Sequence, residues 1–198
     1  ALPGVTEAAL VSGPPLSNSH DGRSFEVEGA PPKAPNAQDP IVLQLVATPG
    51  YFETMGITLL AGRFFQEQDN RPDSERTVII NESFAAHFWP GQNAVDKRLR
   101  FQGAQDWMRV IGVTRDVKHY GLEQPMRPGV YVPYGRARAT GMFGVVHTQG
   151  DPLSLAPAIR EIVRTADAAL PVYDIRTMPQ LVRRSMVLRL IYSWMFTV

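Results

Sequence analysis

The sequence contains no cysteine, and its charges are nearly balanced, with a formal net charge of +1. The absence of cysteine excludes a disulfide scaffold, a thiolate metal site and a cysteine nucleophile, and it is compatible with an oxidising or a reducing compartment. Domains that bind nucleic acid normally carry a basic excess, so this charge balance argues against a nucleic-acid partner. The 198 residues suffice for one large domain or for two small lobes.

Motifs that mark an enzyme are missing as well. The four histidines have no HxH, HExxH or HxxxH spacing that would place two imidazoles on one metal ion. No G-x-S-x-G turn supports a serine nucleophile, and no G-x-G-x-x-G pattern supports a phosphate site. Asp69, Asp73 and Glu75 stand among arginines in a polar loop, which is typical of a solvated surface. We therefore predict no catalytic residue, no metal site and no cofactor.

An apolar run of membrane-spanning length is also missing, although the C-terminus comes close. Residues 187–198 (VLRLIYSWMFTV) are mostly apolar, whereas a bilayer span needs roughly 20 such residues. The segment Thr177-Met178-Pro179 indicates a helix start, because Thr177 can cap the first turn and Pro179 lies where no N–H is needed. The tail therefore fits either the start of a truncated transmembrane helix or a buried C-terminal core helix. The first residues do not form a signal peptide, so we expect any export signal to lie outside this sequence.

Short strand patterns follow one another along the first three quarters of the chain. Alternating or β-branched apolar residues predict strands at residues 5–12, 24–28, 41–47, 77–80, 107–117, 129–133 and 142–148. Residues 30–40 contain four prolines and predict an extended surface connection. Thr48 as a cap and Gly56 as a left-handed stop predict a short helix, and Asn81 is a suitable cap for a second helix over residues 82–88.

The clearest helical pattern covers residues 151–166. Its apolar residues recur at helical spacing and predict one buried stripe, made of Leu155, Ile159, Ile162, Val163 and Ala166. Pro157 fits a first turn, so the helix itself should begin near Ser154. Residues 170–175 (LPVYDI) predict a final strand. Strands, one-sided helices and long irregular connections together predict an α+β fold rather than a doubly wound parallel sheet.

Three long segments carry a family resemblance. They are residues 48–65 (TPGYFETMGITLLAGRFF), 78–101 (VIINESFAAHFWPGQNAVDKRLRF) and 110–134 (VIGVTRDVKHYGLEQPMRPGVYVPY). They resemble the periplasmic core domain of MacB/FtsX-type ABC transporter permeases, most closely the large permeases with a duplicated module. Residues 170–185 (LPVYDIRTMPQLVRRS) resemble the exit from that domain into the next transmembrane helix. One departure is Asp96, where the family usually carries glycine before Lys97-Arg98; the local turn is the feature that this departure affects.

The resemblance implies an extracytoplasmic α+β domain of two lobes, in which a mixed, mainly β lobe is inserted between the halves of a porter-like α/β lobe. Residues 1–47 and 136–176 would form the porter-like lobe, and residues 48–135 the inserted lobe. Residues 177–198 would form a stalk and the start of a truncated transmembrane helix. Because the N-terminal part of the module is missing from the match, we expect the chain to lack a piece of its own sheet.

The resemblance also implies a role without catalysis. The domain would couple movement of the helix after Thr177 to conformational change outside the membrane, in efflux or mechanotransmission. The mechanical joint would consist of Thr177, Pro179, Leu181 and Val182. The alternative hypothesis is a periplasmic ligand- or partner-binding module, based on the aromatic residues between positions 51 and 89 and on an exposed loop at residues 121–129 that contains Arg127.

The location and the partners follow from the same resemblance. It implies an inner (cell) membrane protein whose flanking transmembrane helices hold this domain in the periplasm. A cytoplasmic ATPase subunit, and a periplasmic adaptor or self-association, are the further partners that it implies, although duplicated permeases can lack an adjacent ATPase. Arg183, Arg184 and Arg189 at the proposed membrane entry would place the domain in the cytoplasm by the positive-inside rule. Long domains are translocated largely regardless of charge, so we give the resemblance more weight.

Overall fold

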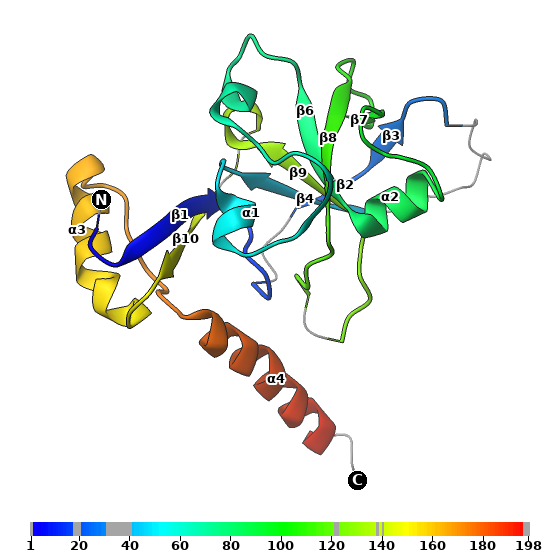
Figure 1. Cartoon of the computed structure of the whole chain (residues 1–198). Helices are drawn as coiled ribbons and strands as arrows, with labels where there is room; N and C mark the ends of the chain where they lie inside the picture. Colours follow the sequence, from blue (N-terminus) through cyan, green and yellow to red (C-terminus); the bar gives the residue numbers. More distant parts are fainter. Residues whose placement is uncertain are drawn as a thin grey trace.

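The computed structural model describes residues 2–17, 21–30, 41–120, 123–137, 139 and 141–186, and the backbone of residues 187–195. In these described residues, ten strands form one mixed sheet, whose main path runs β10-β1-β4-β9-β6-β8-β7-β3, while β2 pairs with β4 and β5 pairs with β8. Helices α1 and α2 lie against this sheet, and α3 and α4 lie at its β1–β10 end (Figure 1). The predicted α+β fold class is confirmed.

The element bounds agree with most of the predicted strands. The strands are β1 (Val5–Val11), β2 (Asp21–Arg23), β3 (Phe25–Val27), β4 (Val42–Ala47), β5 (Leu59–Gly62), β6 (Thr77–Asn81), β7 (Arg98–Phe101), β8 (Met108–Thr114), β9 (Gly129–Pro133) and β10 (Phe143–Thr148). The helices are α1 (Tyr51–Thr54), α2 (Glu82–Phe88), α3 (Ala156–Ala166) and α4 (Met178–Met195), with short 3₁₀ turns η1 (Glu67–Asn70), η2 (Tyr134–Arg136) and η3 (Pro152–Leu155).

The central strands are buried on both faces, so the sheet has a core on each side. Successive side chains of a strand point to opposite faces. On β6, Val78 and Ile80 belong to the cluster that contains Phe84 of α2, whereas Ile79 belongs to the cluster that contains Tyr51 and Phe52 of α1. The two short helices therefore cover opposite faces of the same strands.

Helix α2 begins as predicted. Asn81 has an extended backbone, and its Oδ1 accepts a hydrogen bond of 2.9 Å from the N–H of Phe84. The rings of Phe84 and Phe88 lie 4.4 Å apart, centroid to centroid, on one face of the helix. This cap confirms the prediction for residues 82–88.

The start of α1 differs from the prediction. Thr48 does not cap the helix, because α1 begins at Tyr51 behind Gly50, which adopts φ +84°. The Thr48 hydroxyl instead accepts a hydrogen bond of 2.9 Å from the N–H of Leu10. The predicted stop is confirmed, since Gly56 has φ +64°. Tertiary pairing with β1 thus outcompetes the local cap.

Strands β2, β5 and β7 were not predicted, because partners distant in the sequence define them. β7 carries two arginines, and both find carboxylates near β3: Arg100 pairs with Glu26 at 2.6 Å, and Arg98 pairs with Glu28. β5 pairs with β8 in antiparallel orientation, and the two backbones come very close at Gly62, where an added Cβ would lie 2.1 Å from the carbonyl oxygen of Ile111. That approach requires glycine, whereas the sequence pattern indicated only a turn.

Asp69 corrects the prediction of a solvated acidic surface. It is buried, and it accepts hydrogen bonds from both terminal nitrogens of Arg63, at 2.7 and 2.9 Å, and from Thr77 at 3.2 Å. Burial raises the pKa of Asp69, but these hydrogen bonds and that from the Gln66 N–H outweigh it, so the pKa lies below its ordinary value. Asp69 thus links Arg63, which directly follows β5, to Thr77 at the start of β6.

Two predictions near the C-terminus are wrong. Residues 170–175 form no strand, and Leu170 and Tyr173 are exposed. A strand requires a hydrogen-bonded neighbour, and the described residues provide none for this segment. Helix α3 is confirmed, with Pro157 in its first turn, but its apolar stripe is not buried, since Ile162 is 52% exposed. Within the part of the chain that the structure describes, β1 and β10 are the strands at this end of the sheet (Figure 1).

The predictions about the extreme C-terminus and the proline-rich connection concern residues that lie mostly outside the described part of the chain. Residues 31–40 fall outside the described residues, as do the side chains of residues 187–198. No helix among the described residues has the length and apolar character that a membrane crossing requires.

Candidate functional site at the base of helix α4

Helix α4 starts with a reciprocal cap. The Gln180 side chain accepts a hydrogen bond of 2.9 Å from the Thr177 N–H, and the Thr177 hydroxyl accepts one of 3.4 Å from the Gln180 N–H. This is the capping-box arrangement, which satisfies two N–H groups at a helix N-terminus. Thr177 therefore caps the helix as predicted, and Pro179 lies in the first turn. Gln180 was not among the predicted residues, although the T-x-x-Q spacing is its sequence signal.

The other two predicted joint residues follow directly. Leu181 and Val182 are half-buried, whereas Arg183 and Arg184 behind them are exposed. Figure 1 shows α4 leaving the rest of the molecule, with only its first turns close to the other elements. The structure thus brings Thr177, Pro179, Leu181 and Val182 together in the first turns of one helix.

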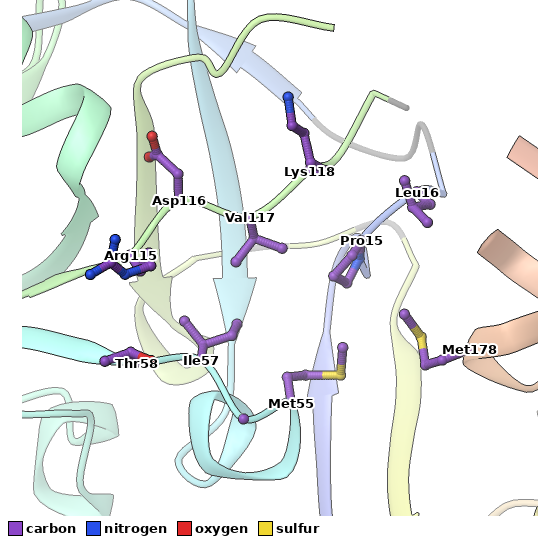
Figure 2. A pocket seen from close by; sticks show the side chains of 11 residues that line it. Pro15, Leu16, Met55, Ile57, Thr58, Arg115, Asp116, Val117, Lys118 and Met178 are labelled. Carbon is purple, nitrogen blue, oxygen red and sulfur yellow. The ribbon is translucent and has the colours of Figure 1, made fainter. Parts of the chain in front are cut away.

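A groove of about 380 Å³ lies between the start of α4 and the body of the domain. Its walls come from four segments that are far apart in the sequence (Figure 2). They are the loop after β1, the end of α1 with the chain that follows it, the segment after β8, and the first residue of α4. The lining residues are Pro15, Leu16, Met55, Gly56, Ile57, Thr58, Arg115, Asp116, Val117, Lys118 and Met178.

Backbone hydrogen bonds hold these walls together. The N–H of Leu16 donates to the carbonyl of Lys118 at 3.1 Å, and the N–H of Arg115 donates to the carbonyl of Thr58 at 2.9 Å. Ile57 follows α1 directly, and its N–H donates to the carbonyl of Phe52 at 2.8 Å. Three of the four walls are therefore fixed to one another or to the core without α4.

The charged residues of the groove are not equivalent. The Asp116 carboxylate accepts hydrogen bonds from the N–H and the hydroxyl of Ser83 at the start of α2. The Lys118 ammonium donates to the carbonyl of Gln124 at 2.7 Å. For the exposed Arg115 guanidinium, the described residues offer no hydrogen bond or ion pair. The acidic side chain is thus already engaged, whereas at least one basic side chain is available.

The aromatic residues proposed for a binding pocket serve the core instead. Tyr51, Phe52, Phe65, Phe84 and Trp89 are buried, and their rings contact one another within the two core clusters. None of them lines the groove at α4. This ring packing removes the aromatic basis of the predicted binding module.

The buried phenol of Tyr51 illustrates the apolar character of this core. Burial raises the pKa of Tyr51 above its ordinary value, and its hydroxyl has no hydrogen-bond partner among the described residues.

Two further features bear on the predicted chemistry. In the loop near residue 121, the guanidinium of Arg127 lies 4.3 Å from the centroid of the Tyr120 ring, so this cation is stacked on an aromatic face.

The described part of the chain contains no group of three or more His, Asp or Glu side chains arranged to hold a metal ion.

A comparison with known protein families identifies the family to which the chain belongs. The family model described as the MacB-like periplasmic core domain matches residues 2–169. Among curated protein sequences, none matches this chain significantly.

Solved structures reproduce the fold. The periplasmic region of MacB from Actinobacillus actinomycetemcomitans is 16% identical, with a TM-score of 0.58 over 83% of this chain and 69% of that chain. The extracellular domain of the noncanonic ABC-type transporter YknZ from Gram-positive bacteria is 14% identical, with a TM-score of 0.58 over 89% of this chain and 84% of that one. A domain of a permease protein from Porphyromonas gingivalis is 19% identical, with a TM-score of 0.55 over 91% and 84%. At these identities the likeness establishes the fold alone.

Proposed function

Because the chain belongs to the family of MacB-like periplasmic core domains, we propose that it is the extracytoplasmic part of an ABC-type permease and couples movement of its membrane helix to conformational change outside the cell membrane. The proposed role is mechanical and involves no catalysis. Efflux and mechanotransmission are both compatible with it.

The observation that carries this proposal is the capped start of α4. Motion passes from one element to another only if the joint between them is stiff enough not to unwind. The reciprocal hydrogen bonds of Thr177 and Gln180 resist unwinding of the first turn. Met178, the first helical residue, lines the groove together with Met55 and Ile57. A tilt of α4 would therefore change the groove that lies between Met178 and the end of α1.

We propose that this movement is taken up by the two lobes of the domain. We assign residues 48–135 to the inserted lobe and residues 1–47 and 136–176 to the porter-like lobe. The β1–β10 pair, from the porter-like lobe, joins the main path of the sheet through one registered pair, Val11 with Ala47. Strand β4 lies at the boundary, because it also pairs with β9 over five residues. A bend at the β1–β4 contact would move the β1–β10 part of the porter-like lobe relative to the rest of the sheet.

The proposed partners complete this assignment. Flanking transmembrane helices would attach the domain to the inner membrane, and a cytoplasmic ATPase subunit would supply the energy. A periplasmic adaptor, or a second copy of the domain, would receive the movement. These partners are inferred from family membership and belong to the proposal.

Removal of the cap tests the mechanical role in the intact permease, studied together with its proposed ATPase subunit. The chain has no cysteine, so Gln102→Cys and Arg183→Cys give two spin labels on exposed positions of the body and of α4. Thr177→Ala combined with Gln180→Ala should destabilise the first turn by about 1 kcal/mol, which corresponds to roughly a fivefold larger unwound population. We expect a broader distribution of the distance between the labels, and a smaller change of that distance on adding ATP and vanadate.

Thr165→Ala is the matched control, because the Thr165 hydroxyl donates to the carbonyl of Glu161 at 2.8 Å on the exposed face of α3. It should leave both the distribution and the ATP-dependent change unaltered. An ATP-dependent change of normal size in the Thr177/Gln180 variant, despite a broadened distribution, would contradict the mechanical joint.

A further inference from the structure

We propose that the groove at the base of α4 binds a single-chain anionic amphiphile, such as a fatty acid, with the chain in the groove and the acidic head at Arg115 and Lys118. This inference concerns ligand binding and does not depend on the mechanical role proposed above.

The apolar part of the groove suits a flexible chain. Met55, Ile57, Val117 and Met178 line it together with Pro15 (Figure 2). Methionine side chains are unbranched and polarisable, so they adapt to chains of variable conformation. A volume of about 380 Å³ falls in the range of small-molecule sites.

The charges of the groove select the sign of the head group. Arg115 and Lys118 both belong to the segment after β8, with Asp116 between them (Figure 2), and Lys118 uses one of its three donor hydrogens for the carbonyl of Gln124. The nearby Asp116 is engaged by Ser83 of α2, which reduces its repulsion of an anion. Arginine and lysine therefore offer free N–H donors to a carboxylate, and the charged residues that line the groove, Arg115, Asp116 and Lys118, sum to +1, which favours an anionic head over a cationic one.

The wall of the groove includes a residue with a strained backbone. Leu16 adopts φ +62°, a left-handed conformation that is unfavourable for a leucine. Its N–H bonds the carbonyl of Lys118, and Figure 2 shows its side chain between Lys118 and Met178. Strain of this kind persists only where the surrounding structure imposes it, and it is concentrated at ligand sites.

Titration with decanoate tests the site on the intact chain. We expect saturable binding with one decanoate per chain, and at least tenfold weaker binding of decyltrimethylammonium, which carries the same chain with a cationic head. In spectra of ¹³C-methyl-labelled methionine, the signals of Met55 and Met178 should shift on binding, whereas that of Met108 in the core should not.

Two variants separate the roles of charge and apolar surface. Arg115→Gln combined with Lys118→Gln should weaken decanoate binding about tenfold or more, and Met178→Asp should abolish it. Met178 is 37% exposed, so this second variant is compatible with folding, which thermal unfolding will check. Arg160→Gln and Ile162→Asp, both on exposed positions of α3, are the matched controls and should bind as the parent does.

Several results would overturn the proposal. Equal affinity for decanoate and decyltrimethylammonium would show that Arg115 and Lys118 do not select an anionic head group. Unchanged binding by both groove variants, unsaturable binding, or methionine shifts that avoid Met55 and Met178 would place the ligand elsewhere. Tighter binding of an uncharged apolar peptide than of decanoate would assign the groove to a different occupant.

Discussion

Asp96 occupies a left-handed backbone position that normally favours glycine. It has φ +68°, its N–H donates to the carbonyl of Val110 at 2.9 Å, and its carboxylate pairs with Arg109 at 2.8 Å. Aspartate tolerates this conformation better than most residues do. The family resemblance indicated glycine at this position, and the structure keeps the turn that a glycine would make while adding an ion pair across it.

Substitution at this residue separates backbone strain from charge. Asp96→Gly relieves about 1 kcal/mol of strain and loses an exposed ion pair worth about 0–1 kcal/mol, so the free energy of unfolding should stay within about 1 kcal/mol of the parent. Asp96→Ala keeps the strain and loses the pair, so it should be less stable than both. Urea denaturation measures this order.

The matched control is Asp106, which pairs with Arg76 at 2.8 Å from an exposed position without a positive φ. Asp106→Gly should cost about 0.5–2 kcal/mol, because glycine adds entropy to the unfolded chain and an exposed ion pair worth about 0–1 kcal/mol is lost. If glycine is equally destabilising at both positions, strain at Asp96 is not the reason for its effect.

At the scale of elements, Asn81 connects α2 to β9. Its Oδ1 accepts from the N–H of Phe84 at 2.9 Å and from the N–H of Gly129 at 2.7 Å, while its Nδ2 donates to the carbonyl of Arg127 at 2.8 Å. Asn81 is only 5% exposed. One side chain therefore satisfies three backbone groups of two elements that lie far apart in the sequence.

Asn81→Ala should destabilise the fold by about 2–4 kcal/mol, because it removes a cap and leaves buried polar groups without partners. Chemical denaturation gives this value directly. Asn93→Ala is the matched control: Asn93 is exposed and accepts one hydrogen bond, from the N–H of Val95, so its loss should cost no more than about 1 kcal/mol. Similar losses in the free energy of unfolding for the two variants would show that burial of the Asn81 hydrogen bonds contributes little to stability.

The same scale shows where sequence patterns are sufficient. Strands β4, β6, β8 and β9 were predictable because several apolar residues in a row face a core, and β1 and β10 were predictable from their β-branched residues although both are largely exposed. β7 was not, because its arginines are stabilised by carboxylates about 70 positions earlier. Residues 170–175 have a strand-like pattern, but the described residues provide no neighbouring strand. Alternation predicts which side chains could be buried, whereas pairing decides whether a strand forms.

At the scale of the whole molecule, the sheet should open unevenly. β6 and β8 lie inside the sheet and are buried almost throughout, whereas β1 and β10 are largely exposed and join the main sheet mainly around Val11. Regions with few buried contacts open at lower free energy than the core does.

Native-state hydrogen exchange measures this difference. We expect backbone amides of residues 5–9 and 143–148 to exchange faster than those of residues 78–80 and 110–113, by on the order of 100-fold. Equal opening free energies for the two groups would mean that the molecule unfolds as one cooperative unit. In that case the β1–β4 contact would not act as a bend in the sheet.

The sequence by itself determined the strand-rich α+β class, the cap at Asn81, the left-handed stop at Gly56 and the capped start of α4, because each of these depends on residues close together along the chain. The tertiary structure alone decided the role of Thr48, the burial of Asp69, the pairing of β7 with β3 and the groove beneath Met178. Each of those brings together residues that are distant in the sequence or exchanges a local hydrogen bond for a tertiary one. No local pattern encodes such a competition, since its outcome depends on which partner the folded chain places within reach.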